Sequence, residues 1–185
     1  MKRFFFFPLI LSFSLFFMNC EKDDPEVVNQ EEVITTLDYT LVPTGGGTTV
    51  TLSFEDLDGD GGAAPTITAG TLAANTTYTG TLTLLNESAS PVDNITEEVE
   101  GEGVDHQFFF QSTVDGISVS YNDQDDNGNP VGLSTTLTTG AAASGTMTIT
   151  LRHEPDKTAT GVSSGDISNA GGETDIEVTF TVAVQ

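Results

Sequence analysis

The 185-residue sequence has one cysteine, no tryptophan, and five lysine and arginine residues against 28 aspartate and glutamate residues. A single cysteine excludes an internal disulfide framework and a cysteine-rich zinc module. The formal net charge of −23 excludes nucleic acid as a partner, because its backbone is itself anionic and the sequence has no basic patch. What remains is one acidic domain, with or without a tail, since the length suits a single core.

Catalytic motifs are also scarce, so the sequence predicts a protein that is not an enzyme. It has no G-x-S-x-G turn for a nucleophilic serine. The glycine run at residues 45–47 has no lysine and no helix after it, which favours a hairpin turn over a phosphate loop. Two histidines and a handful of cations are too few for most polar catalytic machinery.

The N-terminus has the pattern of an export signal. Lys2 and Arg3 precede an apolar run from Phe4 to Phe17, which is too short to span a bilayer of about 30 Å as a helix. The run ends just before Cys20, at a position that resembles the lipobox of bacterial lipoproteins. We therefore expect a signal peptide at residues 1–19 and lipidation of Cys20; the alternative is an ordinary secretory signal with a chance cysteine.

The residues after Cys20 indicate a location. The stretch 20–24, with one lysine followed by acidic residues, resembles the export signal of Bacteroidota-type surface lipoproteins. This resemblance implies a protein anchored by lipid in the outer membrane and exposed at the cell surface, the alternative being a periplasm-facing position. Residues 20–32 then form an acidic tether.

Residues 33–185 alternate apolar and polar side chains in short segments rich in Thr, Val and Ile, which is the pattern of half-buried strands. Turn residues (Gly, Asp, Asn and Ser) separate the segments. The sequence therefore predicts an all-β fold, an antiparallel β-sandwich of immunoglobulin-like type with about eight strands. The segments are 34–41, 50–54, 78–84, 108–110, 117–121, 133–137, 147–151 and 176–184.

One short helix is the exception to this pattern. We expect it within Asp93 to Glu100, where Asn94 is placed to cap a turn that carries Ile95 and Val99. Glycines at 101 and 103 limit its length.

Two acidic loops are candidate calcium sites. Both match the opening of a calcium loop, in which alternate oxygen ligands converge on a cation, but neither has the glutamate that an EF-hand needs at its twelfth position. The alternative is a plain solvated turn, since Asp, Asn and Gly are also turn residues. The candidate ligands are Asp56, Asp58 and Asp60 in the first loop and Asp123, Asp125 and Asn127 in the second.

The two histidines predict a second kind of metal site. His106 and His153 both fall at strand ends beside acidic residues, and imidazole with carboxylate suits Zn²⁺ or another divalent transition metal. The candidate carboxylates are Glu102, Asp105 and Glu154. Two unrelated surface histidines are the alternative.

Four stretches, at residues 69–80, 106–110, 151–155 and 171–178, resemble a group of small Bacteroidota-type surface lipoproteins, some of which carry the label "type 1 periplasmic binding fold". That label implies a two-lobed α/β protein, whereas the strand pattern predicts a sandwich. Similar lipoproteins work beside TonB-dependent receptors, which implies a module that captures a divalent metal or small ligand for outer-membrane uptake. The alternative is a structural or adhesive surface domain without a specific small ligand.

Overall fold

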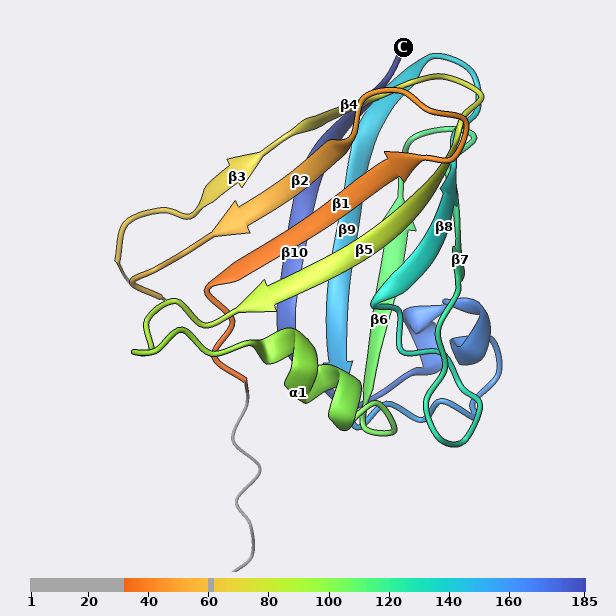
Figure 1. Ribbon diagram of the computed structural model, residues 1–185. Coiled ribbons are helices and arrows are strands. Elements are labelled where there is room, and N and C mark those ends of the chain that lie inside the picture. Colours follow the sequence, from red (N-terminus) through yellow and green to blue (C-terminus); the bar gives the residue numbers. More distant parts are fainter. Residues whose placement is uncertain (1–31, 60–61) are drawn as a thin grey trace, which may run out of the picture. The chain divides into compact units, whose positions relative to one another are not determined.

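The computed structural model describes residues 32–59 and 62–185 (Figure 1). The predicted signal peptide, Cys20 and the tether up to residue 31 lie outside the described residues. The described residues form an all-β sandwich of two sheets, as predicted.

The larger sheet has six strands and the smaller sheet has four (Figure 1). In spatial order the larger sheet contains β3 (Thr66–Thr68), β2 (Val50–Glu55), β1 (Thr36–Pro43), β5 (Thr77–Leu85), β8 (Ser134–Thr138) and β7 (Ser118–Tyr121). The smaller sheet contains β4 (Gly70–Leu72), β10 (Glu173–Val184), β9 (Ala143–His153) and β6 (His106–Ser112). All neighbours pair antiparallel except β4, which pairs parallel to β10.

Eight of these strands coincide with the eight alternating segments in the sequence. The two others, β3 and β4, have three residues each, too few to show a period of two. Their neighbours account for them, since β3 extends the hairpin of β1 and β2, and β4 lies along the last strand.

The core lies between the sheets and is built from the inward side chains of the alternating pattern. At its centre the Tyr39 hydroxyl lies 2.7 Å from the Thr135 hydroxyl. Burial raises the pKa of Tyr39 to about 12, although the hydrogen bond to Thr135 opposes the shift. Gly80 makes room for this pair, because a Cβ atom there would lie 2.5 Å from both hydroxyl oxygens.

Helix α1 (Ile95–Gly101) confirms the expected short helix, and it buries Ile95 and Val99. Asn94 occupies the N-cap position, but its side chain makes no cap hydrogen bond and donates to Glu97 Oε1 instead. Glu102 is the C-cap that follows the helix, and its N–H donates to the carbonyl of Glu98. It thereby leads the chain directly into the start of β6.

Two 3₁₀ turns, η1 (Val162–Ser164) and η2 (Ile167–Asn169), lie in the connection from β9 to β10. They cover the outer side of β6, where Phe109 packs with Val162 and Ala170 in a small second core. Among the described residues, no helix has the length and apolar character needed to cross a membrane.

Candidate metal centre

His106 and His153 lie side by side at one end of the smaller sheet. His106 begins β6, His153 ends β9, and the two are directly opposite in the antiparallel register. Their ring centroids are 4.5 Å apart, with the rings inclined at 73°. Both continue the inward face of their strands, where Phe108 and Leu151 also lie, so the core encloses both rings. His106 is fully buried and His153 is 5% exposed.

Two carboxylates complete the group. His106 Nε2 lies 3.0 Å from Glu32 Oε1 and 3.8 Å from Asp175 Oδ2. His153 Nδ1 lies 3.7 Å from Glu32 Oε2 and 3.8 Å from Asp175 Oδ1. These four side chains, which we call the His₂–carboxylate₂ cluster, offer four ligand atoms that all lie within 4.8 Å of one another. It is the only such group of three or more potential ligands among residues 32–59 and 62–185.

Asp175 enters the cluster through an irregularity in β10. The pairing of β10 with β9 shifts between Thr174 and Ile176, so Asp175 has no residue opposite it in the register. Such a bulge reorients a side chain that the strand would otherwise direct to the other face. The Asp175 side chain is consequently 0% exposed and faces both histidines.

The orientation of His106 fits a metal ligand. Its Nδ1 lies 3.2 Å from the carbonyl oxygen of Glu102, which can only accept, so Nδ1 is the protonated nitrogen. Its other nitrogen, Nε2, faces Glu32 Oε1 at 3.0 Å, a contact that either a proton on the ring or a shared metal cation makes favourable. A backbone carbonyl behind a histidine is a common arrangement around bound metals.

The ligand atoms can be compared with the preferences of common divalent ions. Zinc binds imidazole nitrogen and carboxylate oxygen at about 2.0–2.2 Å, and its tetrahedral angles place two such ligands about 3.4 Å apart. The nitrogen–oxygen distances of 3.0–3.8 Å, which join each histidine to a different oxygen of each carboxylate, lie around this value. Calcium and magnesium prefer six or more oxygen ligands, which this group does not supply.

The carboxylates that the sequence predicted beside the histidines lie elsewhere. Glu102, Asp105 and Glu154 are all exposed and belong to no such group. Glu154 follows β9 with a φ of 49°, in the left-handed region, and its N–H donates to the carbonyl of Asp105. Glu102 contributes only its backbone carbonyl. Sequence neighbours therefore point away from the cluster, and its carboxylates come from residues far along the chain.

The second acidic loop uses its carboxylates internally. Asp123 accepts hydrogen bonds from the N–H groups of Gly132 and Ser134. Asp125 Oδ1 accepts from Asn127 and Asn129.

The other oxygen of Asp125, Oδ2, lies 2.9 Å from Lys157 Nζ. The Lys157 ammonium also donates to the carbonyls of Gly103 and Pro130. It therefore occupies the place that a calcium ion would need, and the geometry favours the alternative of a hydrogen-bonded turn.

The carboxylates of the first acidic loop also accept hydrogen bonds from backbone N–H groups of their own loop. Asp56 Oδ1 accepts from Gly59 N–H and Asp58 Oδ2 accepts from Ala63 N–H, as turn residues do. Asp60 lies outside the described residues.

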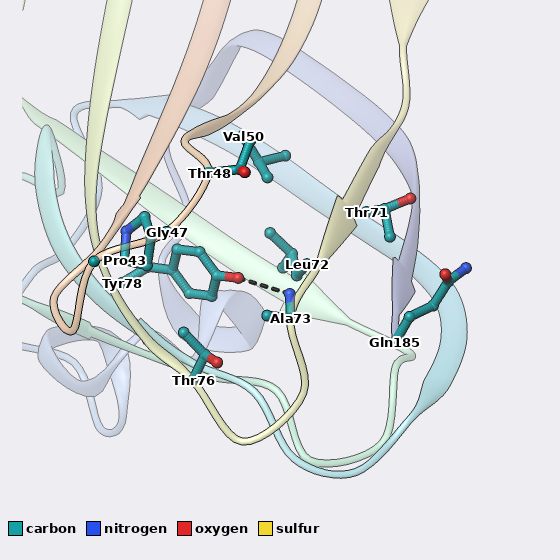
Figure 2. A pocket seen from close by; sticks show the side chains of 11 residues that line it. Pro43, Gly47, Thr48, Val50, Thr71, Leu72, Ala73, Thr76, Tyr78 and Gln185 are labelled. Atoms are coloured by element: carbon teal, nitrogen blue, oxygen red, sulfur yellow. Dashed lines mark hydrogen bonds between the residues drawn. The ribbon is translucent and has the colours of Figure 1, made fainter.

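A cavity of about 280 Å³ opens at the other end of the sandwich (Figure 2). Figure 2 shows the Tyr78 hydroxyl accepting a hydrogen bond from Ala73 N–H beside Leu72 and Val50. No charged residue lines the cavity, which makes it a poor site for a cation. Gln185, which lines the cavity and follows the end of β10, is ten residues from Asp175, about 33 Å for an extended chain.

Compared with protein-family models, with curated proteins and with solved structures, the chain matches none of them. The candidate function therefore rests on the chemistry of the His₂–carboxylate₂ cluster.

Proposed function

We propose that this protein is a lipid-anchored extracytoplasmic module that binds a divalent transition metal, with zinc as the best fit. The observation that carries the proposal is the buried convergence of two imidazole nitrogens and two carboxylate oxygens within 4.8 Å of one another. Imidazole selects zinc and related first-row metals over calcium and magnesium.

The closed character of the cluster favours binding over catalysis. The four side chains are between 0 and 7% exposed, and four protein ligands fill a tetrahedral zinc site. A catalytic zinc keeps one position open for water or substrate.

The cellular part of the proposal comes from the sequence. Lipidation of Cys20 places the module at the outer membrane, most simply at the cell surface, beside a TonB-dependent receptor that takes up the captured ion. The high negative charge supports this role, because it raises the local concentration of cations around the domain.

A structural surface domain, held together by its ion, is the second candidate function. The low exposure of the four ligand side chains also favours this structural role, because an ion that is enclosed by four protein ligands exchanges slowly. Capture and delivery require release, so the rate at which zinc passes to a chelator separates the two functions.

Titration calorimetry with Zn²⁺ on the purified protein tests the proposal. We expect one ion per chain, and a loss of at least about 100-fold in affinity for His106→Gln, since even residues behind the ligands are worth 10–100-fold. Glu154→Gln is the matched control, because this exposed residue adjoins His153 without joining the cluster. Absence of zinc binding by the parent protein, or equal losses in the two variants, contradicts the proposal.

A further inference from the structure

Three ligands of the cluster belong to regular strands, while the fourth does not. His106, His153 and Asp175 lie on β6, β9 and β10, which are neighbours in the smaller sheet. Glu32 precedes β1 by four residues, and β1 belongs to the larger sheet. An ion held by all four side chains therefore joins the two sheets at this end of the sandwich.

Residues 32–34 precede the first strand and are only partly covered by the rest of the fold. Within the described part of the chain, main-chain hydrogen bonding begins at Thr35, whose N–H donates to Leu85 and whose carbonyl accepts from Asp56. Val33 is 57% exposed, and Ile34 is only partly buried against the core. The Glu32 carboxylate is therefore the outermost attachment of the segment 32–34.

Electrostatics couple this attachment to the ion. Glu32 faces a second carboxylate, Asp175, across the two rings, and its Oε1 lies 3.0 Å from His106 Nε2. A divalent cation at the cluster attracts both carboxylates and adds a ligand bond to Glu32, beyond the attraction that a protonated imidazole supplies.

We infer that residues 32–34 form a strap whose closure over the cluster is coupled to the ion; this rests on the proposed function. When the ion binds, Glu32 closes the strap against β6, β9 and β10. When the strap opens, the remaining two histidines and Asp175 leave one coordination position accessible, which is the route by which the ion leaves. Coupling between sites is reciprocal, so zinc protects the strap as much as the strap retains zinc.

Protease cleavage after Glu32 reports on the strap, because a glutamyl endopeptidase must take the Glu32 side chain into its own pocket. We expect saturating Zn²⁺ to slow this cut by between about 5- and 150-fold, the usual range of such couplings. The fragment beginning at Val33 is identified by mass. The cut after Glu87, which is exposed and outside the cluster, is the internal control. In His153→Gln the cut after Glu32 becomes independent of zinc.

Zinc release to a chelator provides the second readout. Glu32→Ala should release zinc about 10- to 100-fold faster than the parent protein. Glu98→Ala, on the exposed face of α1, should release it at the parental rate.

The results of these experiments distinguish the proposed zinc binding from the proposed strap. Absence of zinc binding by the parent overturns the proposed function and the strap together. One zinc ion per chain, with cleavage after Glu32 unaffected by zinc or with parental release from Glu32→Ala, overturns the strap and leaves the proposed function standing.

Discussion

Asp125 and Asp175 both have side chains that are 0% exposed, yet positive charge reaches them by different means. Asp125 lies 2.9 Å from the ammonium of Lys157, which the chain itself supplies. Asp175 lies 3.8 Å from a nitrogen of each of two histidines, which share the space with Glu32. The first carboxylate has a permanent internal cation, whereas the second belongs to a group whose geometry suits an external one.

The comparison shows why acidic motifs alone are poor guides to metal sites. The loop around Asp125 matches a calcium pattern in sequence, but backbone N–H groups and Lys157 use its oxygens. The cluster around Asp175 has no sequence motif, yet four ligand atoms converge there. What distinguishes the two is which side chains the fold brings around each carboxylate, Lys157 in one case and two histidines with Glu32 in the other.

The largest effect on stability is expected from Lys157→Met, which leaves the Asp125 carboxylate buried without its cation. Breaking one side of a buried pair costs about 3–5 kcal/mol, so the urea midpoint should fall markedly. Saturating zinc should raise the urea midpoints of the parent and the variant alike and leave the difference between them unchanged, since Lys157 lies outside the cluster.

The double variant Lys157→Met/Asp125→Asn is the control for this prediction, because it removes the unpaired charge as well. It should be more stable than the single variant. A single variant as stable as the parent would show that the internal cation contributes little.

An intermediate effect is expected on acidification. Burial alone raises the pKa of Asp125, but hydrogen bonds from Lys157, Asn129 and Asn127 and the charge of Lys157 outweigh it, so the pKa lies below 3.8. Such a carboxyl contributes stability that is complete above its unfolded-state pKa and is lost as the pH falls through its folded-state pKa. The stability difference between the parent and Asp125→Asn, followed by urea unfolding, should therefore be constant near neutrality and shrink below about pH 4. A difference that grows on acidification would contradict the assignment.

The smallest effect is expected from Glu102→Gln and Asp105→Asn. Their side chains are exposed and only the Glu102 carbonyl meets His106, so the zinc affinity should change by no more than about twofold, equivalent to about 0.4 kcal/mol. Titration calorimetry measures the zinc affinity of the two variants. A loss of zinc affinity as large as that of His106→Gln would indicate that Glu102 or Asp105 is a ligand and would contradict the assignment of Glu32 and Asp175.

Much of the sandwich was predictable from the sequence because a strand with one buried face alternates its side chains. Tyr39 and Leu41 in β1 and Phe180 in β10 all lie inward, as their period of two predicts. The inward position of His153 also follows from its phase with Leu151. Strands β3 and β4 were not predictable, since three residues carry no period.

Local patterns of residues were enough to predict the eight longer strands, the short helix and the two histidines as candidate ligands. Which carboxylates meet the histidines depends on how distant parts of the chain fold together. By the period of β10 Asp175 belongs to the face opposite Ile176, and the bulge between Thr174 and Ile176 brings it to the cluster. Glu32 belonged by composition to the tether, and it reaches the histidines because β1 starts at the same end of the sandwich as β6 and β10. Pairing register, bulges and the meeting of two sheets are long-range properties, which no local pattern of residues encodes.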